Sequence, residues 1–182
     1  MNRFESAGAE IVWEGKFLRA GVERFRFDDG TEATREKVWH SGAVGILALD
    51  ADCVWLTRQP REVAGLTDSL EIPAGKLDVP GETPLQTGQR ELAEEIGKQA
   101  AQWEEIFSFF STPGFSDERV WLYRATQLSD SPPAELDEDE RIEIVPWPLD
   151  RLGDAISASQ DAKTLIALLW LLAQRSGSSA RA

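Results

Sequence analysis

Four glutamates and one arginine lie at short, regular intervals near the middle of the chain, and their side chains could bind a divalent cation. They are Glu82, Arg90, Glu91, Glu94 and Glu95. Glu91 and Glu95 fall on one face of a predicted helix, because a helical turn takes about 3.6 residues. Two neighbouring carboxylates repel each other unless a positive charge lies between them. Carboxylate oxygens are hard ligands, which favours Mg²⁺ or Mn²⁺ over zinc.

The residues around these glutamates predict a helix with defined ends. Thr83 is a candidate N-cap, Pro84 suits the first helical position, and Gln86 completes a capping box. Gly97 suits the C-terminal end, where glycine readily takes a left-handed conformation. Gly88 lies inside the helix, where glycine costs about 1 kcal/mol relative to alanine. Local rules therefore predict a loop, a helix and a second loop.

The composition is that of one globular domain with an acidic surface. The chain has 182 residues, of which 42% are apolar and 28% charged, so it can bury a sizeable core. The formal net charge of −13 disfavours binding to nucleic acid, which relies on a basic surface. An acidic protein can hold a phosphorylated ligand only through metal ions or a few well-placed arginines.

Neither a secretory signal nor a membrane span is predicted. The first five residues lead into no apolar stretch, and the apolar run 165–173 is too short to cross a bilayer. Cys53 is the single cysteine and cannot form an internal disulfide. We therefore expect a cytoplasmic protein without a membrane partner.

Short apolar segments between turn signals predict many strands and a few helices. The predicted strands are 11–17, 22–27, 36–40, 42–49, 53–59, 69–73, 103–111, 119–126 and 142–147. Besides the helix that carries the glutamates, we expect helices over 149–157 and 161–175. A flexible tail, 176–182, follows them. This pattern is typical of an α+β protein with a mixed α/β/α architecture.

The segment from Gly75 to Gly97 resembles the Nudix box in the order of its glycines, arginine and glutamates. Six residues separate Gly75 from Glu82, where the box usually has five. Lys98 stands where an apolar residue usually follows the last glycine. Neither departure removes a candidate metal ligand. The resemblance implies a three-layer α/β/α sandwich that hydrolyses a nucleoside diphosphate linked to another moiety.

Three further features resemble the ADP-ribose pyrophosphatase branch of that superfamily. The sequence from Glu71 to Gly75 is close to the E-x-P-A-G lead-in, and Arg58 to Arg61 resembles R-Q-x-R. Pro113 lies sixteen residues beyond the box, near the marker proline of the branch. The resemblance implies hydrolysis of ADP-ribose to AMP and ribose 5-phosphate, with Mg²⁺ as cofactor and Mn²⁺ as the alternative. Arg58, Arg61, Glu71 and Pro113 would then contact the substrate.

The resemblance also assigns roles within the box. Glu91 and Glu95 would bind catalytic metal directly, together with the backbone carbonyl of Ala74, and Glu94 would be a ligand or an outer-sphere partner. The remaining residues of the motif would be structural; they are Gly75, Glu82, Arg90 and Gly97.

The general base must come from outside the box, because its glutamates bind metal. His40, the only histidine, lies in the N-terminal region. The acidic segment 135–143 precedes a late predicted strand, where the ADP-ribose pyrophosphatases carry their base on an acidic loop. Aligned on Ile142, Glu138 matches the base and Glu140 an additional metal ligand. Neighbouring acids within one or two positions remain alternatives.

The region before the box domain predicts a homodimer. In the branch that the chain resembles, N-terminal strands commonly exchange across a two-fold axis and help to build the partner's adenosine site. We expect residues 1–41 to be an antiparallel β arm of this kind and residues 42–175 to be the Nudix domain. Arg35 and Trp39 are candidate nucleotide contacts. Alternatively, the arm packs on its own core and Trp39 belongs to an interface.

Two other functions stay open. The same chemistry could act on GDP-mannose, NADH or 8-oxo-dGTP, because a Nudix site recognises the pyrophosphate better than the base or sugar. A protein of this kind could also sense ADP-ribose without cleaving it. Sensors usually carry a damaged box or an added DNA-binding domain, whereas this chain keeps every candidate metal glutamate.

Overall fold

A computed structural model of the chain describes residues 3–132 and 141–179, which form two compact units. The N-terminal unit contains Met1–Gly42 and Phe109–Val120, and the main unit contains Ala43–Ser108 and Trp121–Ala182. The second segment of the N-terminal unit lies far along the chain, and sequence reasoning had placed it in the Nudix domain. Contacts between distant residues, which chain order does not show, bring it to the N-terminal strands.

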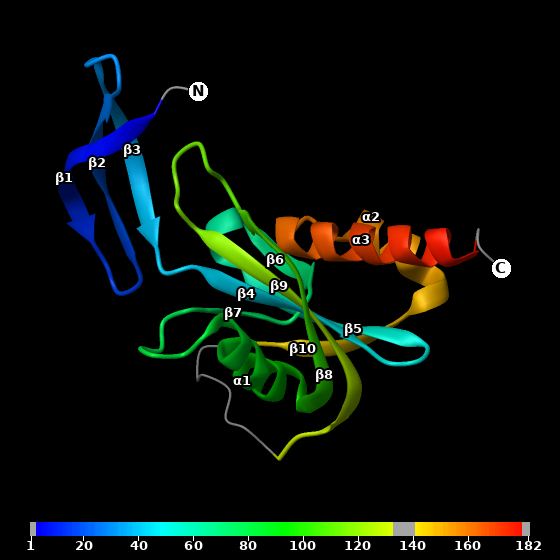
Figure 1. The fold of residues 1–182 in the computed structure, drawn as a ribbon. Coiled ribbons are helices and arrows are strands. Elements are labelled where there is room, and N and C mark those ends of the chain that lie inside the picture. The colour runs from blue at the N-terminus through cyan, green and yellow to red at the C-terminus, as the bar shows by residue number, and fades with distance from the viewer. Residues whose placement is uncertain (1–2, 133–140, 180–182) are drawn as a thin grey trace. The chain divides into compact units, whose positions relative to one another are not determined.

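The N-terminal unit is built on a three-stranded antiparallel sheet (Figure 1). Its strands, in spatial order, are β1 (Phe4–Glu14), β2 (Leu18–Phe27) and β3 (Glu32–His40). The predicted antiparallel arm is therefore confirmed. β1 begins seven residues earlier than predicted, because Phe4 packs edge to face on Phe25 with ring centroids 5.5 Å apart. The amide of Val38 on β3 donates to the carbonyl of Phe115 at 2.8 Å, which ties the segment 109–120 to the sheet.

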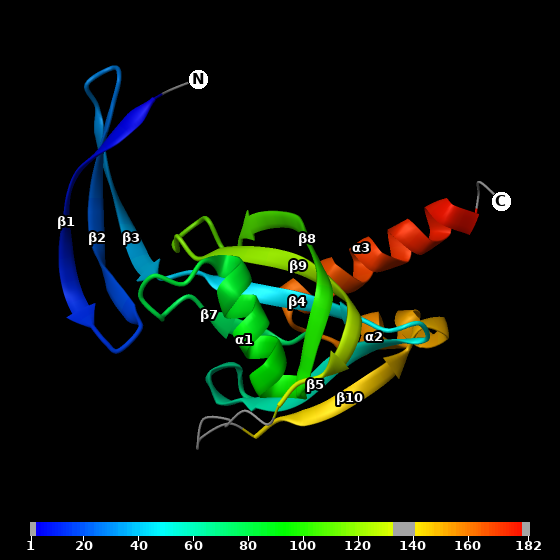
Figure 2. The same cartoon turned by 60° about the horizontal axis from the view of Figure 1, so that its bottom comes forward.

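The main unit is a mixed sheet with helices. Its strands are β4 (Ala43–Leu49), β5 (Cys53–Arg61), β6 (Leu66–Glu71), β7 (Ala74–Lys76), β8 (Lys98–Phe110), β9 (Arg119–Asp130) and β10 (Glu143–Pro148). Its helices are α1 (Pro84–Ile96), α2 (Leu152–Ala158) and α3 (Ala162–Ser179), with short 3-10 turns at Glu62–Ala64 and Leu149–Arg151. The strand order is β10-β5-β4-β9-β8, and β6 and β7 add to it by pairing with β5 and β4 (Figure 2).

Helices cover both faces of this sheet, which confirms the α/β/α architecture. Successive side chains of a strand point to opposite faces. On β4, Ile46 packs in the cluster that contains Leu92 of α1. Its neighbour Leu47 packs in the cluster that contains Leu168 of α3. Figure 1 shows α1 and α3 on opposite sides of the strands.

The predicted ends of the glutamate helix are confirmed. The amide of Gln86 donates to Oγ1 of Thr83 at 3.3 Å, and the amide of Thr83 donates to Oε1 of Gln86 at 2.9 Å. Gly97 ends the helix with φ 64°. The interior Gly88 has a packing reason, since an added Cβ would lie 3.2 Å from Cγ2 of Val44. The glycine lets α1 lie close to β4.

Helix α3 is longer than the sequence suggested. It runs from Ala162 to Ser179, so it includes the first residues of the segment 176–182, whose flexibility stays a prediction. Among the helices of the described residues, none is long and apolar enough to cross a membrane.

Candidate functional site

The carboxylate of Glu95 lies against the backbone between β6 and β7. Its Oε2 accepts a hydrogen bond from the amide of Ala74 at 3.1 Å, and the residue is only 4% exposed. On the other side of Ala74, the carbonyl of Pro73 accepts from the amide of Ile46 at 2.8 Å. The backbone of Ala74, predicted to supply a metal ligand, is thus held next to a predicted ligand side chain.

Glu91 approaches the same backbone one helical turn earlier. A Cβ added at Gly75 would lie 2.0 Å from both Cδ and Oε1 of Glu91. The carboxylate can occupy this position only because residue 75 has no side chain. Three of the five predicted metal ligands, Ala74, Glu91 and Glu95, therefore lie close to the same stretch of backbone.

Arg90 provides the positive charge beside these carboxylates. Its Nη1 lies 2.9 Å from Oε1 of Glu91 and 2.7 Å from Oε2 of Glu94, and its Nε lies 3.4 Å from Oε2 of Glu82. Burial alone would lower the pKa of Arg90, but the three carboxylates raise it above its usual value. Its Nη2 is buried without a hydrogen-bond partner among the described residues. Arg90 therefore stays charged and organises the helix face.

The described residues offer part of a metal site. Among residues 3–132 and 141–176, no three Asp, Glu, His or Cys side chains are grouped so that they could hold a metal ion. Glu91 and Glu95 place carboxylate oxygens against the Ala74–Gly75 backbone, and this donor type fits a divalent cation such as Mg²⁺. Glu94 is engaged by Arg90. The predicted ligand Glu140 lies outside the described residues, as does the predicted base Glu138.

Arg61 and Glu71, both predicted to contact substrate, contact each other. Nε and Nη2 of Arg61 donate to the two carboxylate oxygens of Glu71 at 2.7 and 2.8 Å. Nζ of Lys163 donates to Oε2 of Glu71 at 2.6 Å. Burial would raise the pKa of Glu71, but hydrogen bonds and charge from Arg61 and Lys163 outweigh it and lower the pKa from 4.5 to about 2. Glu71 is thus a carboxylate that orients a half-exposed arginine.

Sequence reasoning missed that the start of α3 contacts Glu71, the partner of Arg61. Besides Lys163, Asp161 and Thr164 lie at the start of α3, where Oδ2 of Asp161 accepts from the amide of Thr164 at 2.9 Å. An aspartate just before an apolar run is an N-cap signal, and the predicted start of this helix at residue 161 agrees with α3 to within one residue. No local signal could have shown its contact with β6. Arg58 is separate, since it pairs with Asp68 at 2.6 Å.

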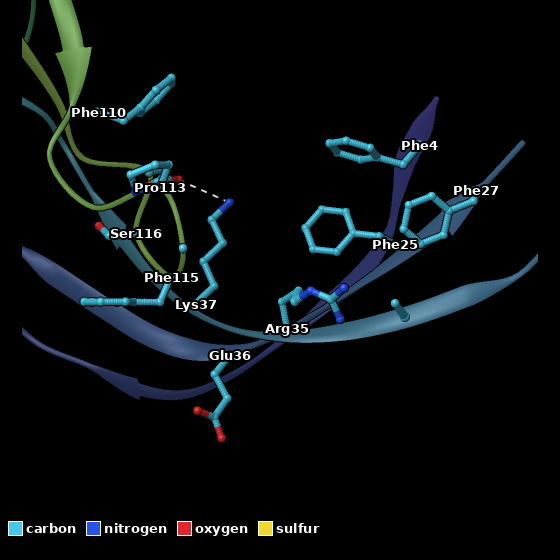
Figure 3. A pocket seen from close by; sticks show the side chains of 13 residues that line it. Phe4, Phe25, Phe27, Arg35, Glu36, Lys37, Phe110, Pro113, Phe115 and Ser116 are labelled. Carbon is cyan, nitrogen blue, oxygen red and sulfur yellow. Dashed lines mark ion pairs between the residues drawn. The ribbon is translucent and has the colours of Figure 1, made fainter. Parts of the chain in front are cut away.

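The N-terminal unit contains a pocket of about 410 Å³. Its lining includes three phenylalanines from β1 and β2, two basic residues from β3, and the turn around Pro113 (Figure 3). They include Phe4, Phe25, Phe27, Arg35, Lys37, Pro113 and Phe115. Two predicted substrate contacts, Arg35 and Pro113, therefore lie in one pocket. Trp39 is not among its described lining residues. Nζ of Lys37 and Cζ of Arg19 lie 5.0 and 6.0 Å from the centroid of the Trp39 ring.

Comparisons with known proteins identify the family of this chain. A family model for the NUDIX domain matches residues 39–169. This chain belongs to the Nudix family. Enzymes of this family generally use divalent metal ions, which is consistent with the oxygen donors at Glu91 and Glu95.

Three relatives from bacteria are similar to this Nudix protein over most of its length. A methanol dehydrogenase activator from Bacillus methanolicus is 37% identical over 172 residues, which cover 91% of this chain and 90% of that protein. An ADP-ribose pyrophosphatase from Bacillus subtilis (strain 168) is 37% identical over 166 residues, or 89% of each chain. Another, from Mycobacterium tuberculosis, is 37% identical over 145 residues, or 79% of this chain and 70% of that one.

A solved structure shares the fold. The crystal structure of an ADP compounds hydrolase superposes with a TM-score of 0.81 and covers 97% of this chain and 96% of its own. The two sequences are 22% identical, so this likeness concerns the fold alone.

Proposed function

We propose that this Nudix protein hydrolyses ADP-ribose to AMP and ribose 5-phosphate, with Mg²⁺ as cofactor and Mn²⁺ as a substitute. The approach of the Glu91 and Glu95 carboxylates to the Ala74–Gly75 backbone carries the proposal, because it gathers hard oxygen donors at one point. Two relatives named ADP-ribose pyrophosphatase, each 37% identical to this chain, support the choice of substrate.

Different residues of the main unit would bind the cation and the phosphates of the pyrophosphate. A bound cation supplies charge neutralisation for the phosphates. Glu91 and Glu95 would hold it together with the carbonyl of Ala74, and Arg90 keeps the glutamates in place through charge-assisted bonds. Arg61, whose side chain is 43% exposed, would bind a phosphate oxygen while its Nε and Nη2 donate to Glu71.

We assign the proton transfer to Glu138, which lies outside the described residues. Glu138 takes a proton from water as the water oxygen bonds to phosphorus, and the bond from that phosphorus to the bridging oxygen breaks. Replacing it by glutamine should lower kcat by roughly 10²–10⁴-fold and leave KM nearly unchanged. Asp137→Asn is the matched control. If Glu138→Gln keeps its kcat and the control does not, the base is the neighbouring acid.

We assign the adenine base to the pocket of the N-terminal unit. Its phenylalanines offer flat apolar surfaces on which a purine can stack, and Arg35 adds a cation that can lie on the ring. The pocket also contains Pro113, whose position in the sequence resembles the marker of the ADP-ribose branch.

We further propose a cytoplasmic homodimer that has no nucleic-acid or membrane partner. The N-terminal unit exposes large apolar side chains, among them Phe4 at 64%, Val12 at 69% and Trp13 at 56%, and such surface is typical of an interface. Size-exclusion chromatography with light scattering should give twice the chain mass of 20.2 kDa. A monomer over the whole micromolar range would refute the dimer without affecting the proposed chemistry.

A substrate panel tests the proposed function directly. ADP-ribose, GDP-mannose, NADH and 8-oxo-dGTP are each incubated with the protein and Mg²⁺, and the products are separated by ion-exchange chromatography. We expect AMP and ribose 5-phosphate from ADP-ribose, and no reaction when EDTA is present. Faster turnover of another compound would change the substrate. Binding of ADP-ribose without turnover of any compound would indicate a sensor.

A further inference from the structure

The short segment between β6 and β7 is held from three directions. The amide of Ile72 donates to Oγ1 of Thr164 on α3 at 2.9 Å. The carbonyl of Pro73 accepts from the amide of Ile46 on β4 at 2.8 Å. The amide of Ala74 donates to Oε2 of Glu95 on α1 at 3.1 Å. Each of three consecutive residues is therefore attached to a different element, and the last carries the carbonyl assigned to the metal.

The bond from Thr164 has a defined direction. Its hydroxyl donates to Oδ2 of Asp161 at 2.6 Å, so the hydroxyl proton is already used and the oxygen is available to accept from Ile72. Both Thr164 and Ile72 are 0% exposed. Water cannot replace a partner there, and a buried amide left without one costs about 1–3 kcal/mol.

The same helical turn also contacts the substrate-binding pair. Nζ of Lys163 lies 2.6 Å from Oε2 of Glu71 and 2.9 Å from Oδ1 of Asp161. Consecutive residues at the start of α3 thus hold the side chain of Glu71 and the backbone of Ile72. Asp161 anchors both, because its two oxygens accept from Lys163 and Thr164.

We propose that Thr164 is a positioning residue for the metal site, acting through the backbone of Ile72. The inference rests on the proposed function in that it takes Glu91, Glu95 and the Ala74 carbonyl as the metal ligands. Without the hydroxyl, the segment from Ile72 to Ala74 loses its anchor on the α3 side of the sheet. The Ala74 backbone then shifts relative to Glu91, and the cation meets a poorer arrangement of oxygens.

The chain offers a matched control at Ser159. Its hydroxyl donates to the carbonyl of Leu70 at 2.9 Å, and the residue is only 7% exposed. This bond joins the C-terminal end of α2 to β6 through a buried hydroxyl, and its acceptor lies two residues before Ile72. Ser159→Ala therefore removes this bond and the 3.3 Å bond that Oγ accepts from the amide of Asp161, while the hydroxyl of Thr164 and its bond to Ile72 stay in place.

The test measures binding of Mn²⁺ alone by electron paramagnetic resonance, without substrate, and Tm for every variant. We expect Thr164→Val to weaken Mn²⁺ binding about tenfold, as removal of an outer-sphere partner commonly does. Thr164→Ser keeps the hydroxyl and should bind within about twofold of the wild type. Ser159→Ala should lower Tm and leave Mn²⁺ affinity unchanged.

Several outcomes would overturn the inference. One is unchanged Mn²⁺ affinity in Thr164→Val beside a loss of Tm like that of Ser159→Ala, since Thr164 would then serve stability alone. If Thr164→Val does not fold, Thr164→Ala replaces it, with weaker Mn²⁺ binding expected and unchanged binding contradicting the idea. A wild type that binds Mn²⁺ but does not cleave ADP-ribose would refute the proposed function only. A wild type that binds no Mn²⁺ would refute both.

Discussion

The glutamate site of the main unit and the aromatic pocket of the N-terminal unit are built in opposite ways. The glutamate site draws on one short stretch, from Ala74 to Glu95, and charged groups hold it together. The pocket draws on β1, β2, β3 and, more than seventy residues further along, the end of β8 and the turn after it, and five of its thirteen lining residues are phenylalanines. Residues proposed to bind the metal therefore come from one short stretch of sequence, whereas residues proposed to bind the adenine base come from segments far apart in the chain. Changes at the first site should therefore act on kcat, and changes at the second on KM.

The largest effect is expected for Glu95→Gln. The change removes a charged oxygen donor, and because a metal supplies several kcal/mol to the transition state, kcat should fall on the order of 10³-fold. Release of AMP from ADP-ribose measures the rate, and circular dichroism checks the fold. Glu104→Gln on β8, whose side chain is 54% exposed, is the control and should keep the wild-type rate. Near-normal turnover in Glu95→Gln would show that the assignment of the metal site to α1 is wrong.

A second change at the same site should separate activity from stability. Gly75→Ala places a methyl group where the Glu91 carboxylate lies, and this carboxylate is the end of a flexible side chain that can move away. We expect turnover to fall roughly 10–100-fold, as with other disturbed ligand shells, while Tm changes little. Gly153→Ala in α2, where the added methyl meets nothing within 4 Å, should keep full activity. An equal loss of Tm and activity in Gly75→Ala would mean that the glycine serves the fold.

The pocket should respond through KM. Phe25→Ala removes a stacking surface, which is worth about 1–3 kcal/mol per base, so KM for ADP-ribose should rise about tenfold at nearly constant kcat. Phe17→Ala removes an exposed phenylalanine of the N-terminal unit that is not among the described pocket residues, and its KM should stay unchanged. A fall in kcat alone for Phe25→Ala would contradict the division between the two sites.

The smallest effect is a dependence of stability on pH. The pKa of Glu71 is lowered from 4.5 to about 2 in the folded protein, so its stabilising contribution is complete above about 4.5 and is lost as the pH falls toward 2. Urea unfolding at several pH values should therefore show a steeper fall of the unfolding free energy for the wild type than for Glu71→Gln. If the unfolding free energy of the two proteins changes equally with pH, the ion pairs with Arg61 and Lys163 do not stabilise the charged form of Glu71.

Sequence reasoning predicted well those parts of the fold that depend on interactions between residues a few positions apart. The capping box at Thr83 and the terminal Gly97 agree with the structure, because each depends on neighbours three or four residues away. The start of β1 was placed too late, because Phe4 is ordered by contact with Phe25, a residue of another strand. The three-residue β7 was missed, because it exists only through its pairing with β4.

The same division runs through the candidate site. Glu91 and Glu95 could be identified from their spacing, since helical geometry alone puts them on one face. Arg61 could be named, but not its attachment to Glu71 and Lys163, which come from β6 and α3. The role proposed for Thr164 was out of reach, because it depends on a bond to a residue ninety-two positions earlier in the chain.

Short-range patterns of residues were enough to predict which glutamates share a helix face, which arginine lies among them, and where the helix begins and ends. Local backbone geometry enforces these relations wherever the helix forms. The folded chain adds what surrounds that helix, including the three hydrogen bonds of the Ile72–Ala74 segment and the pocket of the N-terminal unit. Those arrangements depend on hydrogen bonds and packing between residues far apart in the chain, and no local pattern encodes them.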